Sequence, residues 1–70
     1  MMTIEEFINH LKHKSLRIKI IEEQDKNSSV IFLGDVGFYL NWIDRKRYGK
    51  MLIDHIETFD NGFTIIYCRW

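Results

Sequence analysis

The chain has 70 residues, of which 46% are hydrophobic, and its ten basic and ten acidic side chains give a formal net charge of zero. A chain of this length buries only about 60% of the surface that it exposes when unfolded, so we expect one small domain over residues 1–70 with little room for a catalytic cleft. The hydrophobic content excludes a disordered chain, and the balanced charge excludes an overall electrostatic attraction to nucleic acid or to an anionic membrane.

Eleven isoleucines and the complete absence of alanine and proline are the most unusual features of the composition. Isoleucine uses AT-rich codons, whereas alanine and proline need GC-rich ones. The composition therefore predicts an origin in an AT-rich genome, such as that of a low-GC bacterium or one of its phages or plasmids. Short reading frames from such mobile elements more often encode binding or inhibitory proteins than enzymes.

The sequence also indicates a compartment. Cys68 is the only cysteine, so no intrachain disulfide can form and a reducing environment is favoured. The acidic N-terminal residues do not resemble a secretory signal, and no apolar stretch approaches the roughly 20 residues that cross a bilayer. We therefore expect a cytoplasmic protein that does not act at a membrane.

The first predicted element is a helix over residues 4–14. Thr3 and Glu6 have the spacing of a capping box, in which each side chain accepts a hydrogen bond from the backbone of the other residue. The apolar residues that follow recur at helical spacing, and positive side chains stand in the last turn, where the helix dipole favours them. The apolar positions are Ile4, Phe7, Ile8 and Leu11.

Three strands are predicted next. Apolar and basic residues alternate over residues 16–20, which is typical of a strand with one buried face. A polar loop over 24–29 separates it from the apolar run 30–33, and the turn residues 34–37 precede another extended run over 38–43. These segments predict an antiparallel meander.

The segment before the last strand is ambiguous. Met51, His55 and Phe59 fall on one helical face, which favours a helix over residues 50–59, although Gly49 is costly in a helix and the following Asn-Gly pair is also a strong hairpin signal. A final strand is predicted over 63–70. The preferred fold class is thus α+β, with an N-terminal helix packed on an antiparallel sheet of four strands and a second helix (αβββαβ). The alternative is a helix followed by a five-stranded sheet or barrel.

A basic cluster before this ambiguous segment is the strongest candidate binding site. Arginine and tyrosine are over-represented at binding hot spots, so the cluster suits a protein partner. Two further aromatic residues, Tyr39 and Trp70, are predicted to act as anchors, because so short a chain cannot bury all of its aromatic side chains. The cluster consists of Arg45, Lys46, Arg47, Tyr48 and Lys50.

No catalytic or metal site is predicted. His10 and His13 are three residues apart, but a zinc site needs three or four ligands and no other ligand stands at a recognised spacing. Asp54 and His55 are adjacent without a serine or cysteine nucleophile in a known motif. The side chain of Cys68 is predicted to be either a buried small hydrophobe or an exposed thiol. We expect no cofactor and no enzymatic activity.

The sequence thus predicts a small non-enzymatic protein, encoded by a phage or mobile element, that binds a host protein and inhibits or modulates it. One alternative is a nucleic-acid-binding regulator that uses the same basic cluster together with other basic residues near the first helix and strand. Another is a structural subunit that associates with itself as a homodimer. The additional basic residues of the first alternative are Lys12, Lys14, Arg17 and Lys19.

Overall fold

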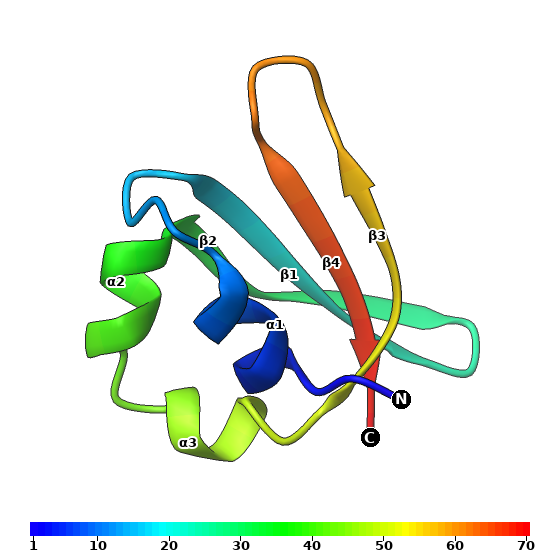
Figure 1. Cartoon of the computed structure of the whole chain (residues 1–70). Coiled ribbons are helices and arrows are strands. Elements are labelled where there is room, and N and C mark those ends of the chain that lie inside the picture. The colour runs from blue at the N-terminus through cyan, green and yellow to red at the C-terminus, as the bar shows by residue number, and fades with distance from the viewer.

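The computed structural model describes residues 1–70 and contains a four-stranded mixed β-sheet with three helices (Figure 1). Two antiparallel hairpins, β1–β2 and β3–β4, lie side by side, and the central strands β1 and β4 pair in parallel to give the order β2-β1-β4-β3. None of the helices is long and apolar enough to cross a membrane. In chain order the elements are α1 (Ile4–His10), β1 (Arg17–Gln24), β2 (Asn27–Asp35), α2 (Val36–Asn41), α3 (Arg45–Tyr48), β3 (Leu52–Thr58) and β4 (Thr64–Arg69).

The fold class predicted from the sequence is confirmed: this is an α+β fold with an N-terminal helix packed on a sheet of four strands. The sheet is mixed rather than antiparallel, because β1 and β4 run in the same direction. The element order is αββααββ, which differs from the predicted order at two segments, and the alternative five-stranded barrel is not formed.

Helix α1 begins where the capping box predicts. The backbone N–H of Glu6 donates to the Thr3 hydroxyl over 3.2 Å, and the Thr3 N–H donates to the Glu6 carboxylate over 2.9 Å. The Thr3 hydroxyl also donates to the Glu6 carboxylate, over 3.1 Å. The hydrogen bonds that this carboxylate accepts from the Thr3 N–H and the Thr3 hydroxyl lower the pKa of Glu6. The helix ends at His10 rather than at residue 14, because the segment after it turns away to cap α2: the carbonyl of Lys14 accepts the N–H of Gly37 over 2.9 Å.

The first predicted strand is confirmed as β1, and the apolar run 30–33 lies within β2. The expected loop over 24–29 is reduced to a two-residue turn, in which Asp25 adopts a positive φ of 54°. Aspartate tolerates this left-handed conformation better than most residues, and a tight turn of this kind extends the pairing of both strands.

The predicted strand over 38–43 is wrong, because residues 36–41 form helix α2. Asp35 caps this helix by accepting the N–H of Phe38 over 2.7 Å. Val36 and Tyr39, three residues apart, are buried on one side, whereas Phe38 is 71% exposed. Apolar and aromatic residues occupy both odd and even positions of this segment, so its hydrophobic pattern suits a helix as well as a strand. The cap by Asp35 favours the helix.

The predicted helix over 50–59 is also wrong, because this segment is strand β3. Its pairing with β4 shifts between Ile53 and His55, which leaves Asp54 as an extra residue in a β-bulge. The bulge interrupts the period-two alternation of the strand. The apolar residues of this segment therefore recur at a spacing that is also typical of one face of a helix. The Asn-Gly pair is a hairpin signal here, and Gly62 takes a positive φ of 88°.

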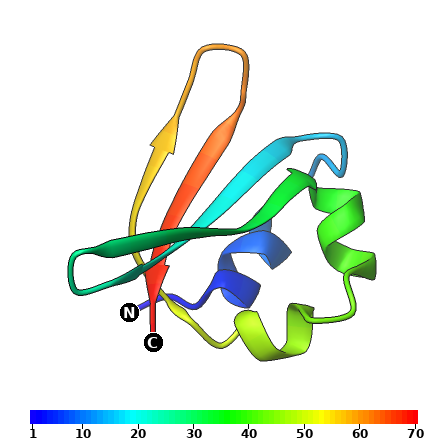
Figure 2. The same ribbon diagram turned by 180° about the vertical axis from the view of Figure 1, so that it is seen from behind.

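The hydrophobic core lies between the helices and one face of the sheet. Figure 2 shows the molecule from behind, where no helix lies over the strands. Alternate residues of the two central strands, such as Ile18 and Ile20 in β1, are fully buried, while their neighbours on the other face are partly exposed. The buried apolar residues are Ile4, Ile8, Ile18, Ile20, Val36, Tyr39, Met51, Ile66 and Cys68.

Tyr39 belongs to this core and is only 2% exposed, so the prediction that it anchors a partner at the surface is wrong. Its ring packs edge-on against Phe32, with centroids 5.5 Å apart. The Tyr39 hydroxyl is buried and has no hydrogen-bond partner. A buried polar group without a partner destabilises the folded state, because it loses its hydrogen bonds to water.

Replacing Tyr39 with phenylalanine is therefore expected to raise the free energy of unfolding by about 1 kcal/mol. The substitution removes the unpartnered hydroxyl and keeps the ring that packs on Phe32. Urea denaturation of the two proteins at neutral pH measures the difference. A loss of stability on Tyr39→Phe would mean that the hydroxyl is hydrogen-bonded in the native state.

Burial also raises two pKa values and so predicts a loss of stability at alkaline pH. It raises the pKa of the Cys68 thiol from 9 to about 12 and that of the Tyr39 hydroxyl from 10 to about 12. Above pH 9 the unfolded chain releases these protons while the native state retains them until the pH approaches 12, so the native state binds more protons.

These two groups therefore contribute stability that is fully present below pH 9 and is lost as the pH rises to about 12. Urea denaturation at a series of pH values across this range measures the effect. The double variant Tyr39→Phe, Cys68→Ala is expected to lose less stability over the same interval. If the stability of the double variant fell with pH as much as that of the wild type, Tyr39 and Cys68 would not be the groups responsible.

Candidate functional site

The predicted basic cluster forms the short helix α3 and its C-terminal flank. The helix ends at Gly49, whose N–H donates to the carbonyl of Arg45 over 2.7 Å. Gly49 is buried, and its carbonyl accepts the N–H of Glu5 over 3.0 Å. Helix α3 is therefore attached to the first turn of α1, which holds the basic residues in a defined place on the molecule.

A series of aromatic rings connects α3 to the core and to the C-terminus. The rings of Trp42 and Tyr48 are stacked, with centroids 5.3 Å apart and an angle of 3° between their planes. The next ring is that of Trp70, 6.1 Å from Tyr48, and Trp70 remains 51% exposed. The indole N–H of Trp70 donates to the carboxylate of Glu22 over 2.9 Å, which fixes the orientation of the ring.

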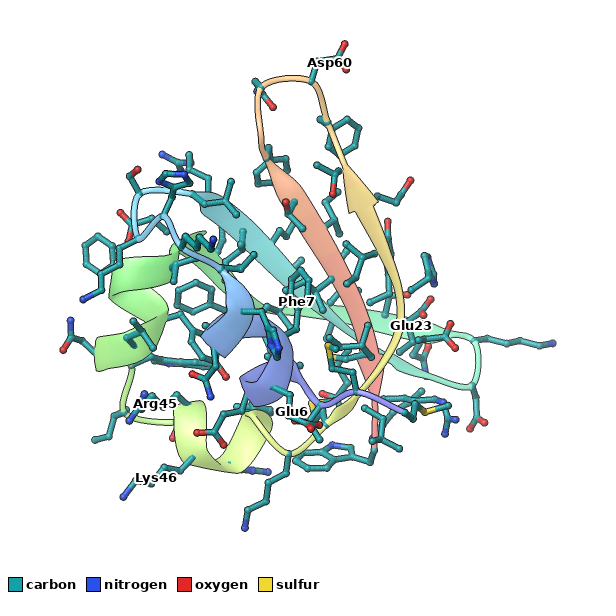
Figure 3. All side chains as sticks on the ribbon, viewed as in Figure 1. Glu6, Phe7, Glu23, Arg45, Lys46 and Asp60 are labelled. Carbon is teal, nitrogen blue, oxygen red and sulfur yellow. The ribbon has the colours of Figure 1, made fainter.

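The cations of α3 have no acidic partner. The only contact within 4 Å between a basic and an acidic side chain is that of His55 with Asp54, so none of the four basic residues is in an ion pair. The guanidinium carbon of Arg47 lies 5.1 Å from the centroid of the Tyr48 ring, at a distance suited to a cation–π interaction. Lys46 projects away from the sheet into solvent (Figure 3).

The structure brings together six of the seven residues predicted as a binding site. We call this group the α3 surface. Tyr48 and Trp70 are far apart in the chain but adjacent in space, whereas Tyr39 lies in the core. The α3 surface consists of Arg45, Lys46, Arg47, Tyr48, Lys50 and Trp70.

Sequence reasoning missed two residues beside this surface. Trp42 supports the ring of Tyr48, and Ile43 is 91% exposed immediately before α3. Both stand directly before the basic run in the sequence, so their position was the available signal. The sequence predicts both residues as part of a strand over 38–43 and therefore does not assign them to the site.

The basic residues required for the nucleic-acid alternative are not gathered at the α3 surface. Helix α3 contacts Glu5 in the first turn of α1, whereas Lys12 and Lys14 follow the last turn of that helix. Arg17 and Lys19 lie on β1. The basic residues therefore form separate groups rather than one continuous stripe.

The chemistry of the α3 surface suits binding. Exposed arginine and lysine side chains without acidic partners attract carboxylates, and two partly exposed aromatic rings offer flat apolar area beside them. Cys68, the only thiol, is buried in the core on the sheet and does not contribute to this surface.

We compared the chain with known proteins by sequence and by structure. No protein-family model, no curated protein sequence and no solved structure is significantly similar to this chain.

Proposed function

We propose that this protein acts by binding another protein through the α3 surface, and that it inhibits or modulates that partner without catalysing a reaction. The supporting observation is the neighbouring pair of aromatic rings of Tyr48 and Trp70, of which Trp70 is half exposed, together with the four basic side chains of the α3 surface, which have no acidic partner in the chain. Tyrosine, tryptophan and arginine are the residues most enriched at binding hot spots.

The partner is proposed to present an acidic surface. The four unpaired cations would steer such a surface to α3, and the aromatic rings would supply the apolar contact that slows dissociation. Because Glu22 and the neighbouring rings orient Trp70 before binding, little conformational freedom is lost at this residue on association. The composition favours a host protein in the cytoplasm of a low-GC bacterium.

Affinity capture from the lysate of a low-GC bacterium tests this proposal. The wild-type protein is expected to retain a stoichiometric protein that resists nuclease treatment, and a variant with alanine at positions 45, 46, 47 and 50 is expected to lose it. The matched control removes the same number of positive charges elsewhere and should retain the partner. It carries alanine in place of Lys12, Lys14, Arg17 and Lys26.

Three outcomes would contradict the proposal. Equal capture by the two quadruple variants would show that the α3 surface is not the binding site. Retention of nucleic acid that is lost on nuclease or high-salt treatment would favour the nucleic-acid alternative, because phosphate contacts weaken steeply with salt. A mass that rises with concentration in the purified protein, without any other partner, would favour self-association.

With the partner identified, Trp70→Ala is expected to weaken its binding roughly tenfold, which corresponds to about 1.4 kcal/mol. Trp70 is half exposed at the C-terminal end of the chain, so its loss should leave the fold intact. Titration calorimetry of the two proteins measures the change. Phe38→Ala is the control, because Phe38 is also exposed but lies on α2 and is not part of the α3 surface. An equal effect of the two substitutions would argue against a specific role for Trp70.

A further inference from the structure

A second cluster of functional side chains lies away from the α3 surface, at the β-bulge of β3. In a regular strand, consecutive side chains point to opposite faces of the sheet. At this bulge Asp54 has no partner on β4, and its carboxylate lies 3.2 Å from Nδ1 of His55. The bulge thus directs two consecutive side chains toward each other, which the pleat of a regular strand prevents.

Glu23 joins this pair from β1, two strands away in the sheet. Figure 3 shows Glu23 close to β3, on the part of β1 that leads into the turn of the β1–β2 hairpin. One donor atom from each of Glu23, Asp54 and His55 lies within 4.8 Å of the others. The parallel pairing of β1 with β4 is what brings Glu23 into reach of β3.

The imidazole is already held in place. Its ring stacks on that of Tyr67, with centroids 4.1 Å apart and an angle of 13° between the planes. The hydroxyl of Tyr67 in turn donates to the carboxylate of Glu57 over 2.6 Å. This hydrogen bond raises the pKa of Tyr67, and the negative charge of Glu23 acts in the same direction. The ring of Tyr67, itself fixed by Glu57, limits the rotation of the imidazole.

The two carboxylates of the cluster lack a lysine or arginine partner. The only basic group within 4 Å of the Asp54 carboxylate is the imidazole of His55, and no basic group lies within 4 Å of Glu23. Two carboxylates and a neutral imidazole carry a charge of −2, which a divalent cation balances. The side chains of Asp54 and His55 are about half exposed, at 50% and 52%, so an ion can reach them.

The geometry points to a binding site for a divalent transition-metal ion, zinc above all, with Glu23, Asp54 and His55 as its ligands. An imidazole nitrogen with two carboxylate oxygens suits zinc, whereas calcium and magnesium prefer oxygen donors alone. Tetrahedral zinc with bonds of about 2.0–2.2 Å holds its donors about 3.4 Å apart. Small rotations of the Glu23 and Asp54 side chains close the present spacing of up to 4.8 Å, while the imidazole stays stacked on Tyr67.

A bound ion would connect β1 to β3 across β4 and leave its fourth position to water. Small domains often gain stability from a metal that links distant segments. Zinc binding to the native state is therefore expected to raise the midpoint of thermal unfolding. This inference does not depend on the α3 surface, and its test needs no protein partner.

Titration of the untagged protein with zinc chloride provides the test. We expect saturable binding of one ion per chain, together with a higher midpoint of thermal unfolding. His55→Phe keeps an aromatic ring against Tyr67 but removes the nitrogen ligand, and it is expected to weaken binding by about tenfold or more. Glu23→Gln should weaken binding as well. His13→Phe is the matched control, because His13 is exposed in the segment after α1 and should leave zinc affinity unchanged.

Visible absorption of the cobalt-substituted protein reports the same site independently, since its spectrum depends on the donor atoms and their geometry. The spectrum is expected to change in His55→Phe and not in His13→Phe. The inference is overturned if the wild type shows no saturable binding, if His55→Phe and Glu23→Gln bind zinc like the wild type, or if His13→Phe loses as much affinity as His55→Phe. Circular dichroism of each variant verifies the fold, and Glu23→Gln decides the matter if His55→Phe does not fold.

Discussion

Replacing Ile66 with alanine is expected to lower the free energy of unfolding by about 2–5 kcal/mol. Ile66 is fully buried in β4, where it pairs with Ile20 of β1 on one side and with Ile56 of β3 on the other. Its truncation leaves a cavity at the centre of the only core. A domain of this size has a total stability on the order of 5 kcal/mol, so the variant should keep only about 0–3 kcal/mol of it.

Urea denaturation followed by circular dichroism measures this loss, and Ile65→Ala is the matched control. Ile65 is the preceding residue of β4, so the pleat of the strand directs its side chain to the opposite face of the sheet from Ile66, where it is only partly buried. Its truncation is expected to cost about 1 kcal/mol, because less apolar area is lost and water fills the space. Equal losses from the two substitutions would contradict a core on one face of the sheet.

Replacing Gly49 with alanine is expected to lower the free energy of unfolding by about 2 kcal/mol, because the added methyl group overpacks the junction of α3 with α1. A Cβ atom at this position would lie 2.7 Å from the carbonyl oxygen of Arg45 and 3.2 Å from Cβ of Glu5. The first contact is with backbone, which cannot rotate away. Relief of the clash must shift α3, so the variant should also bind a partner of the α3 surface less tightly.

Gly37→Ala is the control for this prediction. Gly37 lies in α2, and the nearest atom to its added Cβ would be the capping oxygen of Asp35 at 3.3 Å, so a side chain and not the backbone has to shift, by a few tenths of an ångström, while it still accepts the N–H of Phe38. Alanine is also the better helix former, so the net change in stability is expected to be less than about 1 kcal/mol. Thermal unfolding of both variants distinguishes the cases, and a Gly49→Ala protein as stable as Gly37→Ala would argue against the close packing of α3.

The sequence predicts the part of the candidate site whose residues are consecutive in the chain. The basic cluster from Arg45 to Lys50 is continuous in the chain, and any fold would keep it together. The prediction for Trp70 depends on its aromatic character alone, and only the packing of the C-terminus against Tyr48 places it in the same surface. The prediction for Tyr39 depends on the same character and is wrong, because α2 is a helix that directs this residue into the core.

Local interactions determined the elements that the sequence predicted correctly. The start of α1 depends on Thr3 and Glu6, which are three residues apart, and the burial of alternate residues in β1 follows from the pleat of a strand. These preferences act within a few residues, so they are encoded in the sequence of each segment itself. The α+β class follows from them.

Tertiary structure alone decided the rest. The segment of β3 has apolar residues at a spacing that suits a helix, but its backbone hydrogen bonds are made with β4 in the hairpin. The extra residue at the Asp54 bulge lets a segment without strict period-two alternation pair as a strand. The parallel alignment of β1 with β4 joins residues far apart in the chain, and it brings Glu23 to Asp54 and His55. No local pattern encodes such contacts, because they arise only when distant strands share hydrogen bonds and a common core.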